Sequence, residues 1–84
     1  MNKERMEEII KKEFGVDSLS SPLGSCTEDF LNNKIIEIAM NNDFPKDVIE
    51  IFQKHPYKFP KYKRYDNGEC VGRYYIKLLG IYLN

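Results

Sequence analysis

The chain has 84 residues, of which 42% are hydrophobic and 31% are charged, a balance that excludes a disordered chain and allows one small globular domain. No apolar run reaches the length of a membrane span, and the charged N-terminus lacks the apolar core of a signal peptide, so we expect a cytoplasmic protein without membrane partners. The formal net charge is zero, but residues 1–53 hold six basic and eleven acidic residues (−5), whereas residues 54–84 hold seven and two (+5).

The first predicted element is a helix over residues 3–14. Its apolar side chains recur at helical spacing and form one stripe: Met6, Ile9, Ile10 and Phe14. Asn2 is the expected N-cap, and Gly15 stands where a left-handed residue commonly ends a helix. The other face carries Glu–Lys pairs four residues apart, so we expect a solvated charged surface there.

A loop and a second helix follow. The Ser, Gly and Pro content of residues 15–26 predicts a loop. Three apolar residues would hold this loop against the core: Val16, Leu19 and Leu23. Thr27 is the expected N-cap of the second helix. Apolar residues cover more than half of that helix: Leu31, Ile35, Ile36, Ile38, Ala39 and Met40. We therefore expect it to be the central, most buried helix.

A third helix is predicted between Asp43, its expected cap, and Pro56, which disfavours helical geometry in the residue before it. Pro45 would lie near the first helical position. Apolar residues line one face: Phe44, Val48, Ile49, Ile51 and Phe52. The spacing of the second and third helices approaches that of a helix-turn-helix motif. Carboxylates on the exposed face would repel phosphates, however, and ordinary helix packing is the favoured interpretation.

The last segment allows two interpretations. Asn67-Gly68 between apolar runs is a strong hairpin signal, whereas Asp66 and Glu69 resemble a helix-capping box. The apolar residues that follow fit helical spacing: Val71, Tyr74, Tyr75, Leu78, Leu79 and Tyr82. We therefore predict a fourth helix, despite the cost of Gly72 and Gly80 in a helix interior. Any part of its aromatic stripe that the core leaves uncovered, at Tyr74, Tyr75 or Tyr82, would allow self-association.

These elements predict an all-α fold, a compact bundle of three to four short helices. Residues 1–84 would form one small helical domain with an irregular basic-aromatic connector over residues 54–68. Two prolines in that connector exclude a continuous helix. The alternative is an α+β fold with a C-terminal β-hairpin around Asp66–Gly68.

The connector is the strongest candidate for a binding site. It interleaves basic and aromatic side chains without any acidic one up to Tyr65. The candidate residues, with one from the following helix, are Lys54, Tyr57, Lys58, Lys61, Tyr62, Lys63, Arg64 and Arg73. Lysine and arginine can neutralise phosphates, and exposed rings can stack on bases. The same features suit an acidic protein surface. In a purely structural interpretation the rings pack on the helices and the lysines are merely solvated.

We therefore predict a small non-catalytic regulator that acts by stoichiometric binding to nucleic acid or to the machinery that handles it. The alternative is an inhibitor or immunity-like protein of a phage or mobile element, whose acidic face blocks a basic site on a partner enzyme. The acidic candidates are Glu4, Glu7, Glu8, Glu13, Asp17, Glu28 and Asp29. A third interpretation is that the two oppositely charged portions pack together and partly compensate one another.

Catalysis and metal binding are not expected from this sequence. Cys26, His55 and Cys70 are one ligand short of a structural zinc site and are not spaced as chelating pairs. Two cysteines are too few for a disulfide framework, and we expect free buried thiols. The five glycines are dispersed rather than gathered in a phosphate-binding loop. We therefore predict neither an enzyme nor a cofactor.

Overall fold

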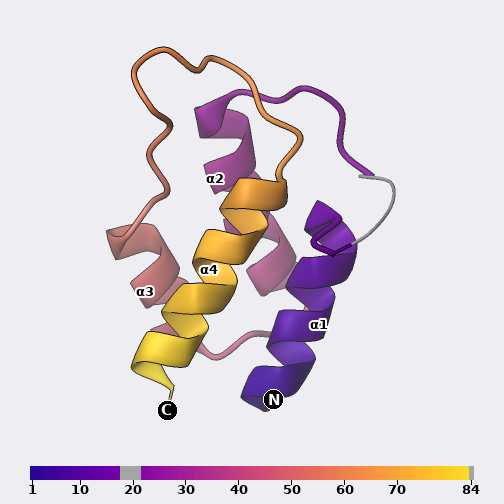
Figure 1. The fold of residues 1–84 in the computed structure, drawn as a ribbon. Coiled ribbons are helices and arrows are strands. Elements are labelled where there is room, and N and C mark those ends of the chain that lie inside the picture. The colour runs from indigo at the N-terminus through magenta and orange to yellow at the C-terminus, as the bar shows by residue number, and fades with distance from the viewer. Residues whose placement is uncertain (18–21, 84) are drawn as a thin grey trace.

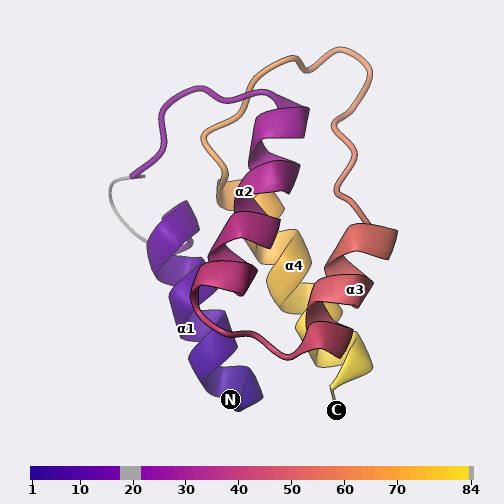
Figure 2. The same cartoon turned by 180° about the vertical axis from the view of Figure 1, so that it is seen from behind.

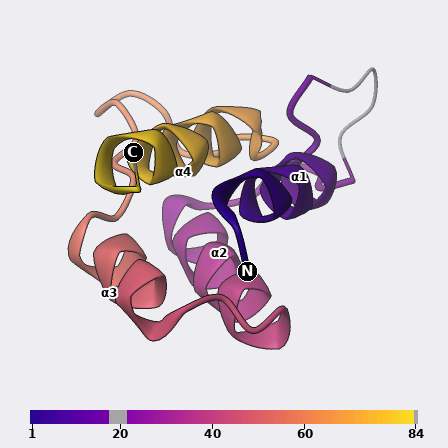
Figure 3. The ribbon, with the colours of Figure 1, turned by 90° about the horizontal axis from the view of Figure 1, so that it is seen from below.

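The computed structural model describes residues 1–17 and 22–83, which contain four α-helices. They are α1 (Lys3–Phe14), α2 (Glu28–Asn41), α3 (Lys46–Lys54) and α4 (Glu69–Tyr82). Successive helices run in alternating directions, and both termini lie at the same end of the bundle (Figures 1 and 2). Viewed along the bundle, α1 lies beside α4 and α2 lies beside α3 (Figure 3). The all-α prediction is confirmed, including the fourth helix.

The predicted alternative with a β-hairpin around Asp66–Gly68 is wrong. In the described part of the chain the β-structure is a single isolated bridge between Cys26 and Asp66. Gly68 instead adopts a left-handed conformation, φ 98°, at the start of α4. Asn-Gly therefore provides the turn into a helix rather than a turn between strands, because the residues after it have helical and not alternating periodicity.

The ends of α1 and the start of α2 follow local sequence signals. The Asn2 side chain accepts a hydrogen bond from the Arg5 N–H at 2.8 Å. Gly15 ends α1 with φ 70°. The Thr27 hydroxyl accepts a bond from the N–H of Phe30 at 3.2 Å. Each of these caps satisfies a backbone group that the helix leaves without an internal partner, as the sequence predicted.

Two predicted caps are wrong. Asp43 has a left-handed backbone, φ 56°, in the turn after α2, and Pro45 occupies the position before the first residue of α3. Asp66 does not form a capping box, because its carboxylate accepts a bond from the N–H of Asn67. The Asn67 side chain, rather than that of Asp66, accepts a bond from the Glu69 N–H at 3.0 Å.

The core lies between all four helices. Its fully buried members include Ile10, Phe14, Leu31, Ile35, Phe52, Val71, Tyr75 and Leu79. Val16 is buried and Leu23 packs against the core as predicted, whereas Leu19 lies outside the described residues. Of the predicted apolar stripes, Ile36, Ile49, Ile51 and Tyr74 are only partly buried against the core, whereas Met40 is 56% exposed and Tyr82 is 47% exposed. Both lie at the edge of the stripe on their helix.

The two longest helices, α2 and α4, have 14 residues each. Within residues 1–17 and 22–83, no helix combines the length and apolar character that crossing a membrane requires. The most irregular surface is the long connection from α3 to α4, which arches over the end of the bundle that lies opposite the termini (Figure 1).

Candidate nucleic-acid interface

The connection between α3 and α4, residues 55–68, is here called the apical loop. Its first part is fixed to two helices through Asn32 of α2. The Asn32 amide donates to the carbonyl of Tyr57 at 2.8 Å, and its oxygen accepts from the N–H of Tyr57 at 3.0 Å. The hydroxyl of Tyr75, in α4, donates to the same oxygen at 2.6 Å. One polar side chain of α2 thereby joins the loop to α4.

Tyr75 is the largest fully buried side chain, and burial raises its pKa to about 12. Its ring packs against that of Phe52 with the centroids 5.0 Å apart. Its hydroxyl also accepts a hydrogen bond from the N–H of Tyr57 at 3.2 Å. The neutral phenol is therefore the form that the folded protein favours, since ionisation would place a charge in the core.

We expect the free energy of unfolding to fall as the pH rises from about 10 to about 12. In this window an exposed tyrosine of the unfolded chain loses its proton, whereas Tyr75 of the folded protein keeps it. The folded state then binds more protons than the unfolded state, and stability decreases with pH. Urea denaturation at a series of pH values measures the slope. Tyr75→Phe, which has no phenol to titrate, should lose less stability over this window, and equal slopes would contradict the assignment.

His55, at the end of α3, provides a second attachment of the loop. Its carbonyl accepts a hydrogen bond from the Tyr74 hydroxyl at 2.9 Å. Its ring Nε2 lies 3.0 Å from the hydroxyl of Tyr82, with the ring centroids 5.5 Å apart. His55 itself is exposed. It ends the helix and contacts two tyrosines of α4, which agrees with a satisfied capping histidine.

The middle and the end of the loop are attached near the start of α2. The N–H of Phe59 donates to the carboxylate of Glu28. Cys26 and Asp66 exchange two backbone hydrogen bonds, of 2.8 and 2.9 Å. Between these two points the N–H of Lys63 closes a turn on the carbonyl of Pro60 at 3.0 Å. The loop is thus held by its backbone, which leaves many of its side chains directed to solvent.

Ion pairs occupy several of the predicted basic residues. Lys54 pairs with Glu50 at 2.8 Å, and Lys63 pairs with Asp66 at 2.9 Å. Arg73 pairs with Glu69 at 2.8 Å and with Asp17 at 2.9 Å. Tyr57 is half-buried and contacts Tyr74. These four candidates serve structural contacts in the folded chain.

Asp66 explains why Lys63 is held in place. Its side chain is only 9% exposed. Burial alone would raise the pKa of Asp66, but the ammonium of Lys63 and the N–H of Asn67 outweigh this effect and hold that pKa below its usual value. A buried carboxylate of this kind requires a partner, so Lys63 stabilises the loop rather than extending from it.

The four remaining candidates are free and exposed, and so is Tyr65, which is not one of the residues that the sequence predicts. Lys58, Lys61 and Arg64 form no ion pair with any residue of the described ranges 1–17 and 22–83. Tyr62 is 88% exposed and Tyr65 is 58% exposed. These five residues, here called the loop-tip set, therefore combine three uncompensated cations with two aromatic rings. Lone exposed tyrosines are ordinary, but two of them beside three free cations on one anchored loop form a recognisable binding arrangement.

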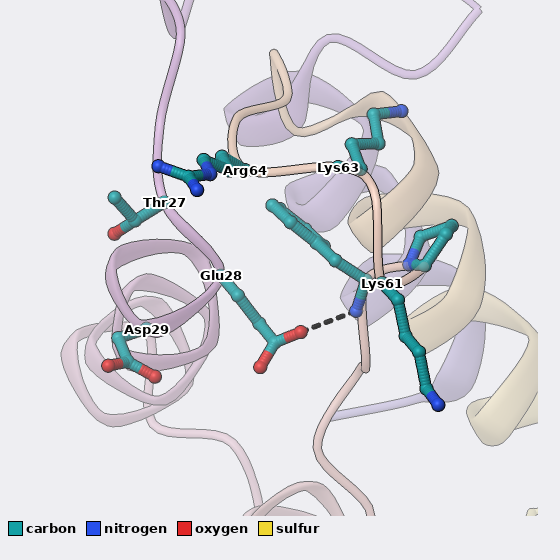
Figure 4. Close-up of a pocket in the computed structure, with 8 residues that line it drawn as sticks. Thr27, Glu28, Asp29, Lys61, Lys63 and Arg64 are labelled. Atoms are coloured by element: carbon teal, nitrogen blue, oxygen red, sulfur yellow. Dashed lines mark hydrogen bonds between the residues drawn. The ribbon is translucent and has the colours of Figure 1, made fainter.

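A shallow cleft of about 400 Å³ separates the loop from the start of α2. It is lined by Thr27, Glu28, Asp29, Phe59, Pro60, Lys61, Lys63 and Arg64. Figure 4 shows the Arg64 side chain extending from the loop toward Thr27, and the Glu28 carboxylate extending from α2 toward the loop. Lys61 and Lys63 point away from α2 in opposite directions (Figure 4). The cleft is therefore of mixed charge, with a guanidinium and a carboxylate on facing walls.

The seven acidic candidates come from different segments of the chain. Glu28 and Asp29 line the cleft beside the basic loop, and Asp17 pairs with Arg73. The other four are in α1, where basic residues alternate with them: Glu4, Glu7, Glu8 and Glu13. In that helix Arg5 lies 3.4 Å from Glu8. Among the described residues, the acidic portion of the chain thus meets the basic portion at Asp17 and at Glu28, which partly compensates their opposite charges.

The cysteines are free thiols, but the expectation that they are buried is wrong. Cys26 is half-buried, and Cys70 is exposed at the start of α4. Within residues 1–17 and 22–83, no group of three or more His, Cys, Asp or Glu side chains could hold a metal ion.

Of the tyrosines considered for self-association, Tyr75 is buried and Tyr74 is half-buried, so Tyr82 and the neighbouring Ile81 provide the exposed apolar area.

The sequence does not indicate the roles that Asn32 and Glu28 have in this region. Asn32 was not singled out, although a polar residue beside Leu31 on the apolar side of a helix is a usable signal. The sequence places Glu28 on an acidic face. It does not reveal the contact of Glu28 with Phe59, because that contact joins residues 31 positions apart. Comparison with protein-family models, with curated proteins and with solved structures finds no match to this chain.

Proposed function

We propose that this protein is a small non-catalytic binding protein that acts by stoichiometric interaction with single-stranded nucleic acid. The observation that carries the proposal is the loop-tip set: Lys58, Lys61, Tyr62, Arg64 and Tyr65. Its cations are free to neutralise phosphates, and its rings are free to stack on unpaired bases. Duplex bases are already stacked on one another, so the exposed tyrosines favour a single strand.

The anchoring of the apical loop supports the same proposal. A flexible segment loses conformational entropy when it binds. A loop that is already ordered largely avoids this cost. Asn32, Glu28 and Cys26 hold the backbone of this loop at three points. The side chains that these contacts leave free are those that a polyanion would meet.

Free Cys26 and Cys70 favour the reducing cytoplasm as the compartment.

The test is a titration of labelled single-stranded and duplex oligonucleotides by fluorescence anisotropy, at low and at moderate salt. We expect Lys58→Glu/Lys61→Glu to weaken single-strand binding at low salt by at least about tenfold, since each reversal replaces attraction to a phosphate by repulsion. Loss of two phosphate contacts should also make the slope of log K against log salt shallower by about 1.4. Tyr62→Ala should weaken binding by about 1–3 kcal/mol, the usual value of one stacked base.

Lys46→Glu/Lys77→Glu is the matched control, because it changes the net charge equally on α3 and α4, outside the apical loop. Both of its lysines are exposed. This control should bind much more tightly than the loop variant. An equal loss of single-strand affinity in the two double variants would show that net charge alone, rather than the loop, determines binding. Absence of single-strand binding by the unmodified protein at low salt would refute the proposed function.

A further inference from the structure

Glu28 of α2 and Arg64 of the apical loop line the same cleft without forming an ion pair. One carboxylate oxygen of Glu28 accepts the N–H of Phe59, whereas the other has no hydrogen-bond partner among the described residues. The Arg64 guanidinium likewise has no partner in the described chain. The ring of Phe59 also lines the cleft. The residues that line the cleft thus supply one free acceptor from Glu28 and a set of free donors from Arg64, with the aromatic residue Phe59 beside them.

This arrangement limits the part of a nucleic acid that can enter. A phosphate at this position would be repelled by Glu28, so the cleft favours a base, which Arg64 contacts, while Lys58 and Lys61 of the loop-tip set contact the backbone. A base that fits this cleft must carry, on one edge, a hydrogen-bond donor for Glu28 next to acceptors for Arg64. Cytosine has this pattern, because its exocyclic amino group lies beside a ring nitrogen and a carbonyl. Carboxylates accept from that amino group in known modes of base recognition.

The other common bases fit less well. Thymine and uracil place a carbonyl where cytosine has its amino group, and Glu28 would repel it. Guanine offers two adjacent donors, which suit two free carboxylate oxygens, but one oxygen of Glu28 is held by Phe59. Adenine has the amino group but only one neighbouring acceptor for the guanidinium. We propose that the Glu28–Arg64 cleft holds a cytosine of the bound strand, an inference that rests on the proposed function and adds base preference to it.

The experiment compares short oligo(dC) and oligo(dT) strands of equal length, at slightly alkaline pH, where cytosine stays unprotonated. The unmodified protein should bind oligo(dC) about tenfold more tightly than oligo(dT), the discrimination expected from one well-formed contact to a base edge. Glu28→Gln removes the charge but keeps an oxygen that can accept the N–H of Phe59. This variant should still bind both strands, but with about equal affinity for oligo(dC) and oligo(dT).

Asp29→Asn is the matched control, since it removes the same charge from the adjacent residue. Asp29 lines the outer edge of the cleft, and Figure 4 shows its side chain directed away from the loop. This variant should keep the preference for oligo(dC). The comparison of the two strands on the unmodified protein requires no variant, so it decides the question even where Glu28→Gln unfolds the domain.

The outcomes separate this inference from the proposed function. Salt-sensitive binding of both strands with equal affinity, lost in Lys58→Glu/Lys61→Glu, would overturn the cytosine site and leave the proposed function standing. Tighter binding of oligo(dT), or an unchanged preference in a folded Glu28→Gln, would also overturn the site. Failure of either strand to bind at low salt would overturn both.

Discussion

We expect Asn32→Ala to lower the free energy of unfolding by about 3 kcal/mol. The substitution removes three hydrogen bonds at once, two to the backbone of Tyr57 and one from the hydroxyl of Tyr75. Each such bond contributes about 1 kcal/mol net, and the Tyr75 hydroxyl is left in the core without its acceptor. Chemical denaturation measures the loss through the midpoint, with an unchanged slope for the same folded state.

The apical loop should respond together with the stability. Since Asn32 holds the backbone of Tyr57, its removal should speed tryptic cleavage after Lys58 and Lys61 under native conditions. Asn33→Ala is the control, because Asn33 is exposed on the same helix and the structure gives it no hydrogen bond. Its stability should stay within about 0.5 kcal/mol of the unmodified protein. An equally small effect of Asn32→Ala would show that the loop does not depend on this side chain.

The second large effect is expected at Gly72 of α4. We predict that Gly72→Ala lowers stability by about 1–3 kcal/mol, although alanine favours helix by about 1 kcal/mol over glycine. A Cβ atom at this position would lie 2.7 Å from Cγ2 of Val16 and 2.8 Å from Cβ of Phe14. Carbon atoms pack best at about 3.5–4.0 Å, and both neighbours are buried, so α1 and α4 would have to move apart.

Gly80 provides the control within the same helix. A Cβ atom added there meets nothing within 4 Å. Gly80→Ala should therefore raise stability by up to about 1 kcal/mol, the gain in helix propensity alone. Thermal and urea denaturation of the two variants gives opposite shifts if the close contact of α1 with α4 is as described. A stabilising effect at both positions would contradict that contact.

The candidate site was only partly predictable from the sequence. The basic-aromatic segment was identified, because composition alone reveals five basic residues interleaved with rings. The sequence did not show which of the candidate cations remain free, because Lys63 and Arg73 pair with carboxylates in the folded chain. The partner of Arg73 at Asp17 is 56 positions away. A linear sequence does not report such pairs, and the division between structural and free cations therefore required the fold.

Helix positions are the part of this protein that its sequence determined by itself. The bounds of α1, its Asn2 cap and its Gly15 end follow from local hydrogen bonding and backbone conformation. The fourth helix follows from the spacing of residues such as Val71, Tyr75 and Leu79, each of which is buried. These signals act within a few residues along the chain, so they can be read without knowledge of what lies opposite.

The tertiary structure alone decided how the faces of these helices are used. Gly72 and Gly80 are equivalent in the sequence of α4, but only Gly72 lies against α1. Glu28 belongs to the acidic portion of the chain, yet it faces the basic loop across a cleft. In each case the deciding neighbour is far away in sequence. Periodicity shows which face of a helix is apolar, whereas the identity of the atoms that meet that face depends on how all four helices pack.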